Sequence, residues 1–346
     1  MRRSLAALTL TLITWTSCGA SVAFAQPALS FSDVPANSPY FDAAEFLKQK
    51  GIMTGYADGT FKPLQGVNRA EAVKIIITSL ATAQDLQAAQ DTQVMYTDIP
   101  AGVWYAPYVE IARGKFGIVD GPPKATAFHG TDPVLKVQFL KMFFLALGTN
   151  PASTYSEITL PLSADVSNTS EWYYPYMRYA LSTSMTMVTP DGSLTPAKTL
   201  TRGEIALLIY RYAMYVEGRR TQALLSESET EIVNVLQFIQ DNHIDQAEYA
   251  SARALLAARG ALTSKPDEAV VKGAVKIAEG FQALVRAYRA GSEGRFDDLL
   301  TLTSDAWHLG EKAKEFSPGL ETVATQMEAI AKNMADQARA MKASGQ

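Results

Sequence analysis

Three positively charged side chains recur at matched positions in the N-terminal half of the chain: Arg69, Lys136 and Arg202. Each stands at the predicted start of a helix, where a cation is unfavourable because the helix dipole already makes that end positive. A cation beside the unpaired amide groups of a helix start can form a site for an anion, and an arginine can hold a carboxylate by two parallel hydrogen bonds. The pattern therefore favours anion binding. The alternatives are solvated surface cations, or ion pairs with the upstream aspartates Asp33, Asp98 and Asp165.

The residues beside two of these cations predict capped helices. Asn68 with Glu71, and Thr201 with Glu204, have the spacing of a capping box. In this motif the cap side chain accepts a hydrogen bond from the third helical amide, and the acid reaches back to the amide of the cap. Capping accounts for these four residues but leaves the recurring cation unexplained.

The elements that must position the cations form three repeats. The segment Phe31-Ser32-Asp33-Val34-Pro35 recurs as Tyr96-Thr97-Asp98-Ile99-Pro100 and, more weakly, as Ser163-Ala164-Asp165-Val166, so that the aspartates lie 65 and 67 residues apart. After each start come aromatic residues, a helical pattern (43–50, 108–115 and 176–183), a turn and a second helix with an apolar stripe. One such unit is too small to bury its own apolar faces, so we expect the three to pack together around a pseudo-threefold axis.

Other residues of the repeats are candidates for contact with a ligand. Trp104 and Trp172 have two alternative roles. An exposed aromatic ring can stack on a sugar face, whereas a buried one fills the core between repeats. Gly55 and Gly121 lie in the turns between the two helices, where glycine permits a tight backbone.

The first 25 residues have the features of a secretory signal peptide. Arg2 and Arg3 precede an apolar run, and Ala23-Phe24-Ala25 is a cleavage site of small residues before Gln26. The only cysteine, Cys18, lies in this signal, so the mature chain is expected to contain no disulfide. No later apolar run is long enough for a transmembrane helix.

The C-terminal part changes in composition near Gly218-Arg219 and is rich in good helix formers. Short connections between its helices predict an antiparallel bundle. Ser226 and Glu229 have the spacing of a capping box before the first helix. The predicted helices cover Glu231 to Ala258, about Pro266 to Ala290, about Gly294 to Phe316, and the segment from Ser317-Pro318 to about Lys342. The aromatic residues expected in the bundle core are Phe281, Phe296 and Trp307.

Composition and motifs exclude several classes of function. The net charge of −4 argues against a general nucleic-acid binder, which needs a basic face. His243 and His308 are isolated and have no acidic partner pattern, so we expect no metal site. No nucleophile elbow or phosphate-binding glycine loop appears, and the chain is therefore predicted to be neither an enzyme nor a cofactor-binding protein.

The repeat motifs resemble a known family. Phe31-Ser32-Asp33-Val34, the run from Gly51-Ile52 through Asp58-Gly59-Thr60-Phe61-Lys62-Pro63, and Asn68-Arg69-Ala70-Glu71 are together similar to the S-layer homology (SLH) domain. The resemblance implies a three-pronged bundle that binds pyruvylated wall polysaccharide, or a modified peptidoglycan-linked glycan, without covalent attachment. It places the key basic residue of the family on Arg69 and Arg202, with Lys136 as a conservative replacement.

The resemblance also suggests which groove binds the glycan. The family's loop glycine falls on Gly55 and Gly121, whereas repeat three has Val188 there and repeat two has Gln138 in place of the family's glutamate. We therefore expect the best groove around Arg69, Gly55 and Asp33, completed by Trp104 or Trp172 from a neighbouring repeat. The predicted glycan-binding set is Arg69, Lys136, Arg202, Gly55, Gly121, Asp33, Asp98, Trp104 and Trp172.

The sequence thus predicts a mostly all-α protein with a separate C-terminal bundle after a pseudo-threefold set of helix-loop-helix repeats. The predicted units are a signal peptide at 1–25, repeats at 30–92, 93–160 and 161–218, and the bundle at 219–346. The predicted function is non-covalent anchoring of a secreted protein to an acidic cell-wall polysaccharide or peptidoglycan at the cell surface. The alternative is an envelope scaffold whose repeats have lost glycan binding and whose tail mediates self-association or binds another envelope protein.

Overall fold

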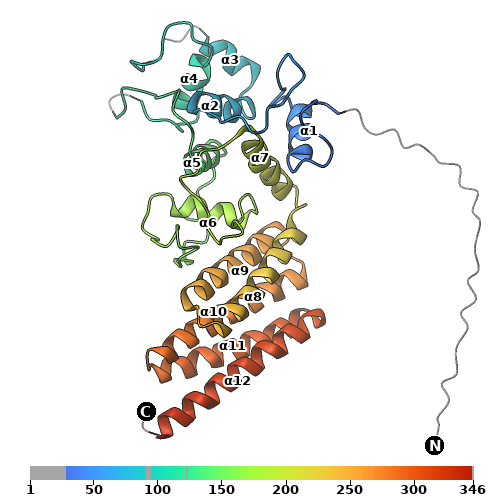
Figure 1. The fold of residues 1–346 in the computed structure, drawn as a ribbon, viewed down its shortest axis with the longest axis vertical. Helices are drawn as coiled ribbons and strands as arrows, with labels where there is room; N and C mark the ends of the chain where they lie inside the picture. Colours follow the sequence, from blue (N-terminus) through green and yellow to red (C-terminus); the bar gives the residue numbers. More distant parts are fainter. Residues whose placement is uncertain (1–28, 91–94, 122–123, 345–346) are drawn as a thin grey trace, which may run out of the picture.

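The computed structural model describes residues 29–90, 95–121 and 124–344 (Figure 1). Within these residues the chain forms twelve α-helices and one short 3-10 helix, and its only β-structure consists of four isolated bridges. The prediction of a mostly all-α fold is confirmed. The predicted signal peptide and Cys18 lie outside the described residues.

Each repeat contributes two main helices. The first helices begin two residues earlier than the sequence pattern predicted: α1 (Phe41–Gln49), α4 (Ala106–Gly114) and α6 (Tyr174–Ser182). The second helices begin at the three matched cations: α2 (Arg69–Thr78), α5 (Lys136–Ala146) and α7 (Arg202–Val216). A short helix that the sequence analysis did not predict, α3 (Ala83–Ala89), follows α2 and packs against α4.

A ring of three backbone hydrogen bonds joins the repeats. The amide of Val67 donates to the carbonyl of Leu200 at 2.9 Å, the amide of Leu200 donates to Val134 at 3.0 Å, and the amide of Val134 donates to Val67 at 3.0 Å. Each of these residues comes from a different repeat, precedes a second helix by two positions and is almost fully buried. The ring therefore sets the starting points of α2, α5 and α7 relative to one another.

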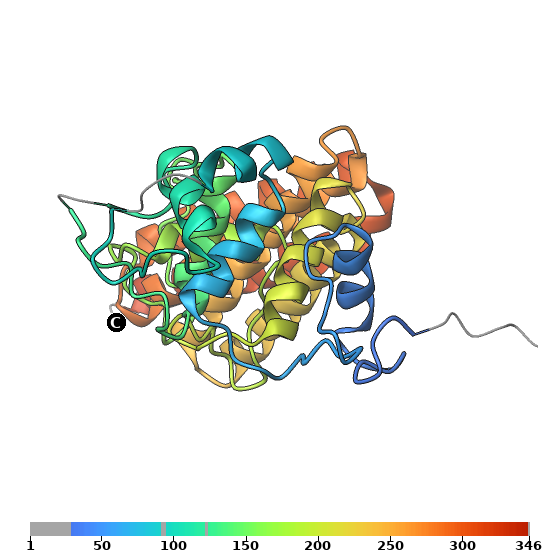
Figure 2. The same cartoon turned by 90° about the horizontal axis from the view of Figure 1, so that it is seen from above.

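The helices pack in the same cyclic order. The second helix of each repeat packs against the first helix of the next one, so that α2 contacts α4, α5 contacts α6, and α7 returns to α1. Figure 2 looks onto the repeats from above, with the C-terminal helices behind them. Side chains such as Val73 and Ile76 of α2 are fully buried between repeats. This arrangement lets three small units share one core.

An aspartate clamps the loop before each second helix. In repeat two, the carboxylate of Asp98 accepts the amides of Phe128 and His129, both at 2.7 Å. Asp33 holds Phe61 and Lys62 in the same way at 2.7 and 2.8 Å. Asp165 holds Leu194 and Thr195 at 2.9 and 2.7 Å. The second residue of each pair has a left-handed backbone, with φ of 57° at Lys62, 58° at His129 and 48° at Thr195.

The clamp compensates for this unusual backbone. A non-glycine residue in the left-handed region costs about 1 kcal/mol or more and persists only where its surroundings hold it. Two charge-assisted hydrogen bonds to consecutive amides provide that restraint. Burial raises the pKa of Asp98, but the amides of Phe128 and His129 outweigh burial and lower it overall. The aspartate that recurs at each repeat start is therefore part of the loop structure.

The C-terminal part is a stack of antiparallel helices below the repeats (Figure 1). Successive helices pack against one another, and α10 also contacts α8 and α12. Its helices are α8 (Thr221–Gln240), α9 (Ile244–Ser264), α10 (Ala269–Ser292), α11 (Phe296–Phe316), the 3-10 helix η1 (Pro318–Leu320) and α12 (Glu321–Ser344).

Three details of the bundle differ from the sequence analysis. The predicted helix from Glu231 to Ala258 is two helices, because the chain turns at Asn242, whose φ is 58°. Ser226 and Glu229 lie inside α8 and form no cap, since this helix begins already at Thr221. Phe281 is fully buried and Phe296 half-buried as expected, but Trp307 is 39% exposed because it lies on the outer face of α11.

The bundle is docked firmly on the repeats. Helix α9 packs against α6, and its Gly260 lies so close to Ser182 that an added Cβ would be 1.7 Å from the Ser182 carbonyl oxygen. Buried Arg253 of α9 donates to the carbonyl of Leu162 at 2.7 Å and pairs with Glu231. The chain passes from α7 to α8 through the turn at Gly218. The contacts of Gly260 and Arg253 fix the arrangement of the bundle on the repeats.

Among residues 29–90, 95–121 and 124–344, no helix is both long and apolar enough to cross a membrane.

Replacing Asp98 by alanine is expected to destabilise the fold by about 1 kcal/mol or more, because the amides of Phe128 and His129 lose the charged acceptor that holds this turn. Urea unfolding followed by circular dichroism measures this loss. Asp132→Ala is the matched control, since this exposed carboxylate accepts no hydrogen bond from the described residues, and it should change stability by less than about 0.5 kcal/mol. Equal stabilities of the two variants would contradict the clamp.

Gly260→Ala is expected to loosen the contact between α9 and α6. The new Cβ would collide with a backbone carbonyl that cannot move aside easily, so we expect a loss of about 2 kcal/mol or more. The control is Gly114→Ala in α4, where an added Cβ meets its nearest neighbour at an ordinary 3.6 Å. Thermal unfolding and limited proteolysis should show a change in G260A only; unchanged behaviour of G260A would disprove close docking.

Candidate ligand groove

Each of the three cations reaches into the loop of the next repeat. Arg69 lies over the ring of Phe128 in repeat two, with 5.2 Å between the guanidinium carbon and the ring centroid. Arg202 lies over Phe61 in repeat one at 5.1 Å. Lys136 reaches Leu194, the matching residue of repeat three. The same register therefore creates three related contacts between repeats, but the residues in them differ.

The amide groups at the helix starts are not available to an anion. The amide of Arg69 donates to the carbonyl of Asp132 at 2.9 Å, and the amide of Ala70 donates to Gly130 at 2.9 Å. The third amide, of Glu71, donates to the side chain of Asn68, and the Glu71 carboxylate accepts the Asn68 amide, both at 2.9 Å. The sequence argument assumed unpaired amides, and that assumption is wrong because loops of a neighbouring repeat supply the acceptors.

The other two helix starts have the same arrangement. The amides of Lys136 and Val137 donate to Lys198 and Pro196, and those of Arg202 and Gly203 donate to Gln65 and Pro63. Thr201 and Glu204 exchange the two hydrogen bonds of a capping box, at 2.9 and 3.4 Å. At α5, Gln138 accepts the amide of Leu135 at 3.1 Å.

Lys136 is committed to contacts within the protein. Its ammonium donates to the carbonyl of Leu194 at 2.7 Å and to the hydroxyls of Thr195 and Thr186 at 3.1 and 3.4 Å. The residue is only 8% exposed. Burial lowers the pKa of Lys136 to about 8, and the nearby positive charge of Lys198 contributes to the shift. Lys136 therefore joins repeats two and three and is not presented to a ligand.

Arg202 is partly committed. Its Nε donates to the carbonyl of Phe61 at 2.9 Å, and its guanidinium lies 4.8 Å from the ring centroid of Tyr56 as well as over Phe61. These contacts orient the terminal nitrogens and leave them without a hydrogen bond to the described residues. Gly55, which precedes Tyr56, thus belongs to the same groove as Arg202.

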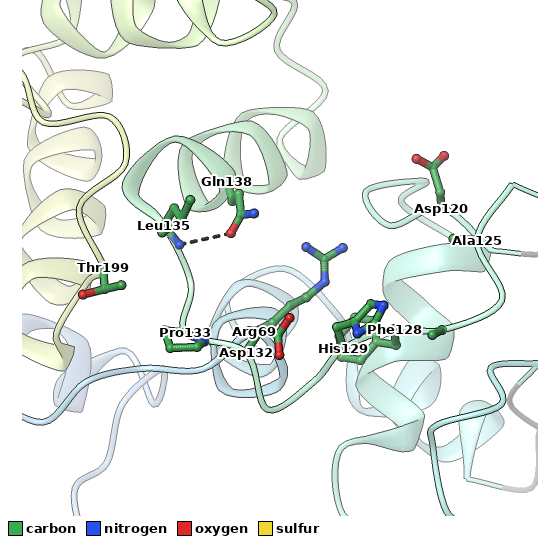
Figure 3. A pocket seen from close by; sticks show the side chains of 11 residues that line it. Arg69, Asp120, Ala125, Phe128, His129, Asp132, Pro133, Leu135, Gln138 and Thr199 are labelled. Carbon is green, nitrogen blue, oxygen red and sulfur yellow. Dashed lines mark hydrogen bonds between the residues drawn. The ribbon is translucent and has the colours of Figure 1, made fainter. Parts of the chain in front are cut away.

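Arg69 differs from the other two cations. Within the part of the chain that the structure describes, its guanidinium makes no hydrogen bond, and its Nε is buried without a partner. Burial lowers the pKa of Arg69, and this effect outweighs the nearby Tyr96, Asp132 and Asp120, which raise it. The guanidinium points into a cavity of about 590 Å³ between α2, α5 and the loop of repeat two. Figure 3 shows Arg69 between Gln138 on one side and Phe128 with His129 on the other.

We call this cavity the Arg69 groove. Its polar lining combines one free cation with acceptors and donors of hydrogen bonds. Asp120 and Asp132 are exposed carboxylates, and Gln138 and His129 face the same space (Figure 3). The sequence analysis missed His129, Asp132 and Asp120 as groove residues. His129 lies in the turn that Asp98 holds, and this position was the available signal in the sequence. Using that signal required knowing that repeat two faces Arg69.

The structure changes the grouping of the predicted site residues. Arg69 does not share a groove with Gly55 and Asp33, because each cation faces the next repeat and those residues face Arg202. The carboxylates of Asp33 and Asp98 are occupied by two amides each and serve as loop clamps.

The two turn glycines have steric roles. An added Cβ at Gly55, where φ is 82°, would lie 2.4 Å from the ring of Phe31. One at Gly121 would lie 2.7 Å from the side chain of Arg113, next to the Arg69 groove. In both turns glycine therefore allows a close approach that a larger residue would prevent.

The two tryptophans lie at the surface near lysines of the preceding repeat. Trp104 and Trp172 are each 51% exposed. The ammonium of Lys74 lies 5.2 Å from the ring of Trp104, and that of Lys141 lies 5.3 Å from the ring of Trp172. Neither ring lines the Arg69 groove itself. Their exposure rules out core packing as their main role and leaves them as exposed aromatic surfaces.

No group of three or more histidine, cysteine or acidic side chains in the described residues is arranged to hold a metal ion. His243, which precedes α9, and His308 in α11 are both exposed.

Two segments of the chain are similar to a known protein family. The S-layer homology domain family matches residues 30–73 and 164–206. The chain is 27% identical over 180 residues to an S-layer protein of Bacillus thuringiensis subsp. finitimus, covering 52% of this chain and 21% of that protein. It is 32% identical over 113 residues to an S-layer protein of Bacillus licheniformis, covering 33% and 12%. Cell surface glycoprotein 1 of Acetivibrio thermocellus is 26% identical over 171 residues, covering 47% and 7%.

The chain thus aligns with about a fifth or less of the length of these relatives. The matches indicate a secreted protein associated with the cell surface or cell wall. The two segments that match the S-layer homology domain, residues 30–73 and 164–206, carry Arg69 and Arg202 at the starts of α2 and α7.

Proposed function

We propose that this protein attaches itself non-covalently to an acidic cell-wall polysaccharide or peptidoglycan-linked glycan, and that the Arg69 groove is its main binding site. The observation that carries the proposal is the Arg69 guanidinium, which is half-buried over Phe128 and has no hydrogen-bond partner in the described residues. A buried polar group without a partner is uncommon in folded proteins and calls for an explanation. A carboxylate from a ligand supplies the missing acceptor.

The lining of the groove favours a saccharide over a simple anion. Arg69 can pair with one acidic group, such as a pyruvyl or uronic carboxylate. Asp120 and Asp132 would repel a second negative charge, but they accept hydrogen bonds from hydroxyl groups. A ligand with one acid and several hydroxyls satisfies both conditions. The exposed rings of Trp104 and Trp172 offer further surfaces on which sugar rings stack.

The protein acts by binding and not by catalysis in this proposal. Support comes from the relatives, whose names describe S-layer and cell-surface proteins, and from the SLH segments, which imply binding to a cell-wall polymer. The five-helix bundle then stands below the repeats as an extension (Figure 1).

A second candidate function is an envelope scaffold whose repeats have largely lost glycan binding. The observation in its favour is that Lys136 is buried in contacts with repeat three, so that this one of the three matched cations is not free to bind a ligand. Self-association through α12 has less support. The residues of α12 turned away from α11 are polar and exposed, for example Gln326, Asn333 and Gln337.

Pelleting of the purified chain (residues 26–346) with isolated cell-wall sacculi tests the leading proposal. Arg69→Gln should weaken binding by about tenfold or more, because a charged hydrogen bond is lost. Adding Arg202→Gln should weaken it further, whereas Lys136→Met should have the smallest effect. Arg286→Gln is the control, because Arg286 is an exposed arginine of α10 in the bundle.

The glycan itself provides the second arm of this test. Sacculi from which pyruvyl groups have been removed by mild acid should bind less wild-type protein if pyruvate is the acid that Arg69 holds. Wild-type pelleting by R69Q would refute the Arg69 groove, and absence of pelleting by the wild type would favour the scaffold function.

The buried lysine predicts a particular pH dependence. Because the pKa of Lys136 is lowered to about 8 in the folded protein, the unfolded chain binds more protons than the folded one between about pH 8 and pH 10.5. The contribution of Lys136 to stability therefore rises through this range. Relative to Lys136→Met, the wild type should gain about 1–2 kcal/mol between pH 7 and pH 9.5.

Urea unfolding at the two pH values measures this difference. Lys124→Met, whose side chain is 81% exposed in the wild type, should follow the wild type at both values. If K136M and the wild type respond equally to pH, the ammonium of Lys136 is not buried as described.

A further inference from the structure

A second cavity lies far from the grooves, where repeat three meets the bundle. This junction cavity has a volume of about 480 Å³. One wall comes from the segment after α6 and from α7, and the other from α8 and α9. The apolar residues that line it are Leu181, Met187, Val188, Ala223 and Ala257.

The charges around the junction cavity do not balance. Three arginines and two glutamates line it. Arg253 pairs with Glu231 through two hydrogen bonds, at 2.7 and 2.8 Å. Arg220 pairs with Glu227 at 3.3 Å, and both also contact Ser184. The two acids therefore each have a partner already.

Arg211 of α7 is the cation left over. Among the described residues no carboxylate lies within 4.0 Å of it, and its one hydrogen bond goes to the carbonyl of Met185 at 3.3 Å. Burial, and then the positive charge of Arg220, lower the pKa of Arg211 and outweigh the opposing effect of Glu227, so the charge of Arg211 is only partly compensated. The guanidinium of Arg211 is half-buried beside an apolar cavity and therefore lacks the polar partners that a charged group needs.

We propose that the junction cavity binds a small monovalent carboxylate with an apolar body, whose carboxylate pairs with Arg211. The planar guanidinium fits a carboxylate, and the surplus of one positive charge matches one negative charge. A doubly charged phosphate fits less well, since it would also face Glu227 and Glu231. The apolar side chains leave room for a short aliphatic or alanine-like body, and the volume lies in the range of small-molecule sites.

Two sources supply this chemistry: a short fatty acid, and the carboxyl end of a small apolar peptide. Titration of the purified chain (residues 26–346) with hexanoate and with acetyl-alanyl-alanine separates them. Calorimetry gives the affinity, and the NMR signal of the Met187 methyl group reports on the cavity itself. At least one probe should bind and shift this signal, while hexanamide, which has no charge, should bind at least about tenfold more weakly.

Two variants and a control complete the test. Arg211→Gln should lower the affinity of the binding probe by about tenfold or more, and Arg286→Gln should leave it unchanged. Ala223→Leu fills the cavity and keeps Arg211, so it should abolish binding even if R211Q proves unstable. Failure of both carboxylates to bind, equal binding of hexanamide, or wild-type affinity in A223L would each overturn the proposal. None of these outcomes depends on binding to sacculi.

Discussion

Three backbone hydrogen bonds between Val67, Val134 and Leu200 hold the starting points of α2, α5 and α7 in one register. Because each of these residues both donates and accepts, the three bonds close into a ring and leave no free edge in the centre of the repeats. The cation of each repeat follows its ring residue by two positions, so the ring also fixes where the three cations stand. A shift of any one segment would displace all three cations together, and the cyclic packing of helices supports the proposed threefold relation between the repeats.

Equal positions in this frame do not produce equal sites. Over Phe61 and Phe128 the cation is an arginine, whose flat guanidinium stacks on an aromatic ring and keeps its ends free. Opposite Leu194 it is a lysine, which has a compact charge and turns to a carbonyl and two threonine hydroxyls. Repeat three has Leu194 where the other repeats have a phenylalanine, and the cation that faces it is a lysine instead of an arginine. The two differences therefore occur at the same contact. Repeat three has become a structural partner of repeat two at this contact.

The sequence predicted what depends on neighbouring residues along the chain. Helix starts at Asn68 and Thr201 and the apolar stripes follow from local spacing, and the structure has them. The partner of each cation did not follow, because Arg69 meets Phe128 only through the order in which the repeats close. Asp98 looked like a ligand residue since its two partners, Phe128 and His129, lie about thirty positions away. The break at Asn242 was missed although the residues from Gln240 to His243 are all polar and interrupt the apolar spacing after Ile239.

The contact between α9 and α6 determines how the two parts of the protein act together. Gly260 brings the two backbones close, and Arg253 bridges Glu231 of α8 and the carbonyl of Leu162 in repeat three. A buried ion pair adds little net stability, but removing one partner is costly, so such a pair selects one arrangement over others. The bundle is therefore held in one orientation on the repeats. If the repeats bind a wall polymer, that polymer also fixes the direction in which α10, α11 and α12 extend, and the tail then acts as an oriented projection instead of a flexible appendage.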